Sequence, residues 1–244
     1  MNPRLLIAGL LGVVMTGYIY SVPDARLFRD PAMARILFTH VPSAFVASIF
    51  FVIAAWAGLQ VLGKGRVLHR ARLHAAVELG ALFAGFTMAT GILFSRVQWG
   101  EWWHNDPRQT SFLIVLLSYL ALLGLRGAFS DPEKRDKTTA AYAVALLLPA
   151  IFLTFIYPRL PHVAQQSFHP STTIPKGELD TAYQIGLWGN VTAFLLLAFF
   201  VYGLRVRQEL HSRALENLDD HLADSHHDSP DSRVRRPVAV RRED

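Results

Sequence analysis

The segment at residues 99–111 reads WGEWWHNDPRQTS and is a polar, aromatic connection between two long apolar runs. Its indole rings combine a wide apolar face with a polar edge, which suits either the membrane–water boundary or a large planar ligand. Gly100 and Pro107 disfavour a continuous helix here, so the segment is expected to form a loop or a short surface helix. An aromatic belt and a ligand platform both remain open on these residues alone.

The composition predicts a protein that crosses a membrane several times. Hydrophobic residues make up 52% of the chain, the mean hydropathy is +0.27, and the charges are confined to short stretches. The chain has no cysteine, which excludes disulfides, thiolate nucleophiles, Cys-ligated zinc and iron–sulfur clusters. The net charge of +5 does not indicate nucleic acid, because the cations lie at the ends of apolar runs and in the C-terminal segment.

Six apolar runs predict an all-α fold, a polytopic six-helix transmembrane bundle in which the Trp-rich segment is an external loop. The first run is near the lower length limit for a span and is expected to be retained rather than cleaved as a signal peptide. Residues 1–207 are expected to form one membrane domain, and residues 208–244 a polar, flexible cytoplasmic tail. The runs cover residues 5–20, 36–62, 73–95, 111–125, 139–157 and 181–204.

The distribution of basic residues predicts the orientation of the bundle. Lysine and arginine cluster in the second and fourth connections and just after the last span, which the positive-inside bias places in the cytoplasm together with both termini. The first, third and fifth connections are then external. His40, the Trp-rich loop, His162 and His169 are therefore all expected at the outer surface.

The histidines are the first candidates for a ligand site. His40 lies a few residues into the second span, where an imidazole is costly unless it has partners, although a bond to a carbonyl or water would be a purely structural explanation. His162 and His169 lie in the fifth connection. Two imidazoles beside a platform of indoles could bind iron from both sides of a planar macrocycle.

Asp106 and Arg108 are the charged candidates in the Trp-rich loop. They could form a structural pair that pins the loop, which is the favoured interpretation for Asp106. Arg108 could instead face an anionic group, such as a haem propionate.

These residues resemble a known family, the membrane haem-handling proteins of cytochrome c maturation, especially the CcmC type of the tryptophan-rich WWD-domain superfamily. Members carry a segment close to W-G-x-W-W-x-W-D-x-R-x-T-S, which this chain matches except at Asn105, where the family has a third Trp of that run. The H-V-P-x-A motif is matched at residues 40–44. The resemblance covers the six-span core and excludes the tail.

The resemblance implies a site that binds haem b transiently and has no catalytic residue. His40 matches the first axial ligand, and the local sequence at residues 167–170 favours His169 over the alternative, His162, as the second. The Trp-rich segment would contact the macrocycle. The residues expected to bind the cofactor are His40, Trp99, Trp102, Trp103, Asp106, Arg108 and His169.

The expected function is haem handling in cytochrome c biogenesis at the bacterial inner membrane. The resemblance implies delivery of haem to a periplasmic haem chaperone, with ATP-binding cassette transporter subunits and a small membrane subunit as partners in the bilayer. The chain is expected to be a transfer component rather than an enzyme.

Two alternatives remain. A synthetase-type protein that attaches haem to apocytochrome c usually has more spans. A membrane cytochrome b subunit would need facing histidine pairs inside its spans.

Overall fold

The protein is described by a computed structural model covering residues 3–26, 28–169, 176 and 179–227. Within these ranges the regular structure is entirely helical, which confirms the predicted all-α fold. The long helices are α1 (Pro3–Ser21), α2 (Leu37–Lys64), α3 (Val67–Trp99), α4 (Pro107–Gly127), α5 (Pro132–Ile151) and α7 (Thr181–His227). The short elements are η1 (Pro31–Ile36), η2 (Phe152–Ile156), η3 (Tyr157–Arg159) and α6 (Pro161–Ala164).

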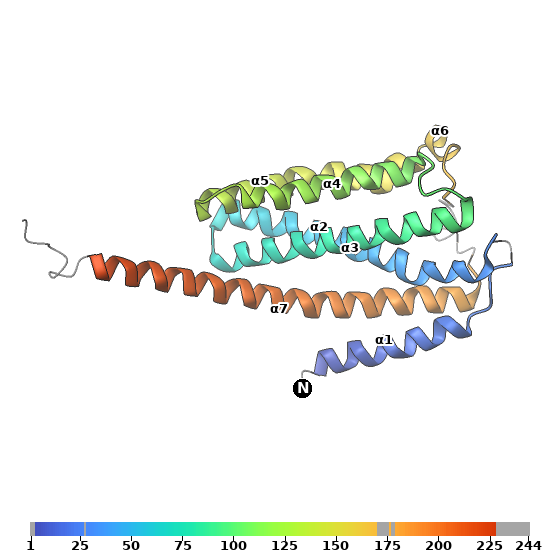
Figure 1. The fold of residues 1–244 in the computed structure, drawn as a ribbon, viewed down its shortest axis with the longest axis horizontal. Coiled ribbons are helices and arrows are strands. Elements are labelled where there is room, and N and C mark those ends of the chain that lie inside the picture. Colours follow the sequence, from blue (N-terminus) through green and yellow to red (C-terminus); the bar gives the residue numbers. More distant parts are fainter. Residues whose placement is uncertain (1–2, 27, 170–175, 177–178, 228–244) are drawn as a thin grey trace, which may run out of the picture.

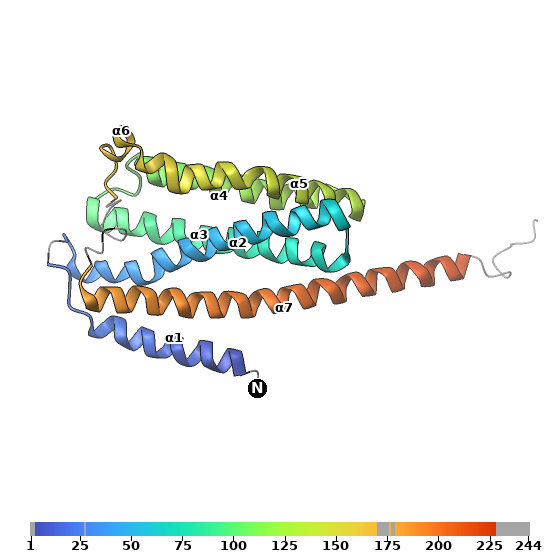
Figure 2. The same cartoon turned by 180° about the vertical axis from the view of Figure 1, so that it is seen from behind.

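Each predicted apolar run corresponds to one long helix except the fifth, residues 139–157, which continues from α5 through η2 to the start of η3. Five helical segments of the described chain are long and apolar enough to cross a membrane, whereas the first apolar helix, Leu5–Ser21, is shorter. This first helix lies along α7 (Figures 1 and 2). Its Met15 side chain packs on Gly189 of α7, where an added Cβ would overlap the Met15 Cε. The first run is therefore an integral part of the bundle.

The helices form successive layers, with α4 and α5 on one side, α2 and α3 next to them, and then α7 and α1 (Figure 1). The connections before α2, between α3 and α4, and between α5 and α7 gather at one end of the bundle (Figures 1 and 2). This end carries the Trp-rich loop, so the three connections predicted to share a side do so.

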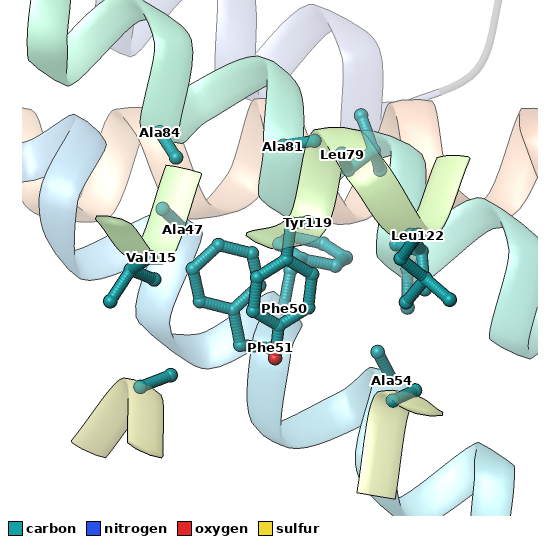
Figure 3. Packing of buried hydrophobic residues seen from close by; sticks show 14 of the residues in the cluster. Ala47, Phe50, Phe51, Ala54, Leu79, Ala81, Ala84, Val115, Tyr119 and Leu122 are labelled. Carbon is teal, nitrogen blue, oxygen red and sulfur yellow. The ribbon is translucent and has the colours of Figure 1, made fainter. Parts of the chain in front are cut away.

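The middle of the bundle is held together by aromatic rings packed against small residues. Phe51 of α2 stacks on Tyr119 of α4, with ring centroids 3.6 Å apart and planes inclined by 16° (Figure 3). Gly80 of α3 makes room for this ring, because a Cβ there would lie 2.7 Å from Phe51. Close approach at small residues is the usual way in which membrane helices pack, since lipid provides no hydrophobic driving force between them.

A buried charge cluster joins α3, α5 and α7 at the end of the bundle opposite the Trp-rich loop. The carboxylate of Asp136 is fully buried and lies 2.8 Å from the His74 Nε2 and 2.8 Å from the Arg213 Nη1. Glu209 lies 3.0 Å from the His74 Nδ1 and 2.9 Å from the Arg213 Nη2. Burying these charges is tolerable only because each has opposite charges within contact distance.

This cluster explains where the structure differs from the predicted boundary at residue 207. Helix α7 does not end there but continues to His227. Glu209 and Arg213 face the bundle and pair with α3 and α5, so the start of the predicted tail is packed structure. The polar composition after 207 signals the end of the apolar run, but not the end of helix packing. The predicted flexibility of residues 228–244 lies outside the described residues.

The buried cluster predicts a large stability loss when its central carboxylate is neutralised. Asp136→Asn leaves Arg213 and His74 buried beside an uncharged amide, and breaking a buried pair of this kind costs about 3–5 kcal/mol. We expect a clearly lower unfolding temperature in mild detergent.

The matched control is Glu133→Gln on the same helix, which removes a carboxylate that is 61% exposed and forms an ion pair with the exposed Lys137. This variant should unfold close to the wild-type temperature. Equal unfolding temperatures for the two variants would contradict the importance of the cluster.

Candidate functional site

A cavity of about 770 Å³ opens among α2, α3, α4 and the connection that leads to α7. Its walls are mostly apolar, with Met88, Phe94 and Phe112 among the lining side chains. His40, Arg108 and His169 also line it. Three of the predicted site residues, from three separate parts of the chain, are therefore brought to one cavity.

His40 stands on the first turn of α2 and is held from α3. Its Nδ1 lies 3.0 Å from the Thr90 hydroxyl oxygen, and its Cε1 lies 3.1 Å from the position that a Cβ on Gly91 would take. The Nδ1 side of the ring is therefore packed against α3. His40 also lines the cavity.

Asp106 is the N-cap of α4 and fixes the end of the Trp-rich loop. Its Oδ1 accepts hydrogen bonds from the backbone N–H groups of Arg108, at 2.9 Å, and Gln109, at 3.3 Å. Pro107 follows at the first helical position, where its missing N–H costs nothing. This cap determines where α4 begins and sets Arg108 in the first turn, at the cavity.

The same carboxylate holds the segment that carries His169. Asp106 accepts hydrogen bonds from the Ser167 hydroxyl at 2.9 Å and the Phe168 N–H at 2.6 Å, and its Oδ1 lies 3.2 Å from the His169 Nδ1. Burial raises the pKa of Asp106, but the hydrogen bonds from His169, Ser167 and Phe168 outweigh burial and hold the pKa well below its usual value. Because a charged carboxylate can only accept, the His169 Nδ1 carries the proton in this contact, and in the neutral form of the ring Nε2 then has the free lone pair.

Trp99 forms a second layer behind the cavity wall. Its ring meets two cavity-lining rings edge-on, Phe94 at a centroid distance of 5.3 Å and His169 also at 5.3 Å. It also packs against Phe168, at 5.3 Å, and His104, at 6.0 Å. Trp99 therefore gives His169 a second contact besides Asp106.

The other two tryptophans of the loop point elsewhere. Trp102 is 58% exposed and its ring lies 5.8 Å from the Arg96 guanidinium carbon. Trp103 packs partly buried against the bundle core and donates its indole N–H to the Asn105 side-chain oxygen at 2.9 Å. None of the three indoles is among the residues that line the cavity.

His162, the alternative to His169, lies on α6 and is exposed. It is not among the residues that line the cavity. Of the two histidines in this connection, the structure brings only His169 together with His40.

Comparison with known proteins shows which family the chain belongs to. A family model described as heme exporter protein C (CcmC) matches residues 2–220. The chain belongs to the heme exporter protein C family.

Individual members of the heme exporter protein C family align over most of their length. The protein of that name from Paracoccus denitrificans is 26% identical over 216 residues, which cover 87% of this chain and 88% of the relative. The Bradyrhizobium diazoefficiens protein is 29% identical over 195 residues, 78% of this chain and 72% of the relative. The Escherichia coli K12 protein is 27% identical over 207 residues, 84% of this chain and 82% of the relative.

Asn105 replaces the third tryptophan of the motif by which the chain resembles the CcmC family, and the local geometry explains it. Its φ of 53° lies in the left-handed region, which costs most side chains roughly 1–2 kcal/mol and which asparagine adopts more readily. Its side chain also accepts the Trp103 N–H. The substitution therefore shapes the turn before Asp106 and holds Trp103 against the core.

Sequence reasoning missed two features of the cavity. Thr90 and Gly91 hold His40, but a threonine and a glycine in an apolar helix give no recognisable signal. Arg159 also lines the cavity. Its signal was present, because it is an isolated cation directly after the fifth apolar run.

The double role of Asp106 predicts a local loosening when it is removed. Asp106→Ala deletes both the α4 cap and the contacts to the His169 segment, so amide hydrogen exchange of residues 160–169 should accelerate. Mass spectrometry of the detergent-purified protein measures this directly.

Asp131→Ala is the matched control, because Asp131 caps α5 in the same way, accepting from the N–H groups of Glu133 and Lys134. That variant should lose only a cap, worth about 0.5–2 kcal/mol, and change exchange only at the start of α5. Unchanged exchange at residues 160–169 in Asp106→Ala would show that the carboxylate does not hold this segment.

Proposed function

We propose that the chain binds haem b in this cavity through His40 and His169 and passes it to a periplasmic haem chaperone during cytochrome c maturation. Its membership of the heme exporter protein C family supports this role. The observation that carries the proposal is that His40 and His169, far apart in sequence, line the same cavity.

The chemistry of the cavity fits the ligand. A volume of about 770 Å³ is within the roughly 300–1,000 Å³ of typical ligand sites, and the apolar walls match the faces of a porphyrin. Haem iron takes imidazole nitrogens as axial ligands. Both histidines have Nδ1 engaged, with Thr90 and with Asp106, which leaves Nε2 of each to bind metal.

Arg108 and Arg159 provide positive charge for the two haem propionates. Both line the cavity at the end that carries the Trp-rich loop. Arginine suits carboxylates because its planar guanidinium can donate two parallel hydrogen bonds. In this arrangement the propionates point toward the loop end and the apolar edge of the macrocycle points into the bundle.

The tryptophans have separate roles in this proposal. Trp99 supports His169 and Phe94 from behind. Trp102 offers an exposed indole beside the site, where the macrocycle or the chaperone can contact it during transfer. Trp103 holds the loop against the core.

The work of the protein is binding and presentation, and we propose that it makes and breaks no covalent bond. ATP-binding cassette transporter subunits and a small membrane subunit are the proposed partners, and any ATP hydrolysis belongs to the transporter. The helical segments of membrane length make the chain a multi-pass membrane protein, for which we propose the bacterial inner membrane.

The proposed orientation places the cavity on the periplasmic side and both termini in the cytoplasm. Lys64 ends α2 and Arg66 follows it in the loop, and the start of α5 contains Lys134 and Lys137, all at the end away from the cavity. Basic residues concentrate on the cytoplasmic side of membrane proteins.

The ligand assignment predicts an ordered set of histidine variants. His40→Ala and His169→Ala should each lower bound haem at least tenfold after purification in mild detergent, because each removes an axial ligand. His162→Ala should keep wild-type haem, since this side chain lies outside the cavity. The Soret absorbance per protein measures the occupancy.

His162→Ala is also the control for changing a histidine in the same connection. Full haem retention in the His40→Ala, His169→Ala double variant would eliminate the proposed site. If His162→Ala loses bound haem and His169→Ala retains it, His162 rather than His169 is the second ligand.

The orientation predicts which engineered cysteines can be labelled from outside. Because the natural chain has no cysteine, Gln166→Cys and Lys64→Cys each introduce a single thiol. In intact spheroplasts a membrane-impermeant maleimide should react with position 166, and with position 64 only after permeabilisation. The opposite pattern would invert the proposed topology.

A further inference from the structure

The hydrogen bond between His40 and Thr90 bears on which ring nitrogen of His40 carries the proton and which one can bind a metal. The His40 Nδ1 lies 3.0 Å from the Thr90 Oγ1. The same hydroxyl lies 2.9 Å from the carbonyl oxygen of Phe86 and 3.0 Å from that of Thr87, one turn earlier in α3. Thr90 thus faces three groups with a single hydroxyl hydrogen.

One arrangement of hydrogens satisfies all of these groups at once. In it the Thr90 hydroxyl donates to the Phe86 or Thr87 carbonyl of its own helix, as threonines within helices often do. The hydroxyl oxygen then has only lone pairs to offer to His40. A bonded Nδ1 must therefore carry a proton, and in a neutral imidazole this leaves Nε2 unprotonated.

Gly91, next to Thr90, allows the His40 ring to approach α3 closely. A Cβ at Gly91 would lie 3.1 Å from the His40 Cε1 and 3.7 Å from its Nδ1. The first of these distances is tighter than ordinary van der Waals packing, so the ring edge can approach α3 this closely only because position 91 has no side chain. Thr90 and Gly91 together hold one edge of the ring against α3.

We propose that Thr90 is a positioning residue of the haem site, which locks His40 in the tautomer protonated at Nδ1 so that Nε2 is presented to the cavity. This inference rests on the proposed function, since it concerns how His40 meets iron. Hydrogen bonds from the second nitrogen of a metal-bound histidine orient the ring and raise its basicity. Thr90 would have for His40 the role that Asp106 has for His169.

The first test needs no haem. In protein labelled with ¹⁵N-histidine and purified without haem, the nitrogen shifts of His40, assigned by comparison with His40→Ala, should report the Nδ1-protonated tautomer. Thr90→Val keeps the size of the side chain but removes the acceptor, so its His40 signals should move toward the Nε2-protonated form. Thr90→Ser retains the hydroxyl and should restore the wild-type signals.

The second test uses added haemin with the same full-length variants. Thr90→Val should weaken haemin binding about tenfold to a hundredfold, the usual effect of losing such a partner, and should raise the reduction potential of the bound haem. Thr90→Ser should restore both values. Thr192→Val is the matched control, because the hydroxyl of this exposed α7 threonine donates to the Trp188 carbonyl of its own helix.

The outcomes separate this inference from the proposed function. If His40→Ala loses haemin while Thr90→Val keeps wild-type tautomer, affinity and potential, His40 is a ligand and Thr90 does not position it. If Thr90→Ser is as impaired as Thr90→Val, the lost feature is not the hydroxyl, and the inference is overturned. If His40→Ala binds haemin normally, the proposed function fails at this ligand, while the tautomer measurement still decides whether Thr90 holds the ring.

Discussion

The carboxylate of Asp106 is the contact on which the organisation of the loop end depends. It receives the two N–H groups that begin α4 and, on its other side, the donors of the segment that carries His169. Two connections that are far apart in sequence therefore meet on one buried negative charge. A carboxylate with several donors around it stays ionised despite its burial, and removing it would leave all of these donors without their acceptor.

The first histidine is fixed by an independent arrangement. His40 is held on the membrane helices α2 and α3, by a neutral hydroxyl rather than by a carboxylate. The two sides of the cavity thus differ in kind: one belongs to the rigid helical wall, and the other belongs to a loop secured by Asp106. The cavity forms where these two supports face each other, and its apolar walls come from the same helices that build the bundle.

Features that depend on composition and on sequence motifs could be predicted from the sequence. Long uncharged runs identify membrane helices because an exposed backbone cannot be left unpaired in lipid, and this gave the all-helical fold and the shared end of the three connections. The same reasoning gave His40, Arg108 and His169, which the cavity unites. The direction of the three indoles could not be predicted, because it depends on the left-handed turn at Asn105 and on local ring packing.

Long-range side-chain pairing was also invisible in the sequence. Nothing in the residues around 74, 136 and 213 shows that their charges neutralise one another inside the bundle, so the polar sequence after 207 looked like the start of a tail. Thr90 was missed for a related reason, since its importance lies in which ring it faces.

Helix α7 connects the two ends of the molecule as a single rod. At a rise of 1.5 Å per residue, its 47 residues span about 70 Å, more than twice the thickness of a bilayer's hydrocarbon core. Near one end its Tyr183 forms part of the cavity wall, and beyond the charge cluster its other end projects past the remaining helices (Figures 1 and 2). For a stiff lever of this length, a tilt of about 5° displaces the far tip by roughly 6 Å. A small tilt of α7 at the cavity end of the bundle therefore moves its other end by more than the pitch of one helical turn.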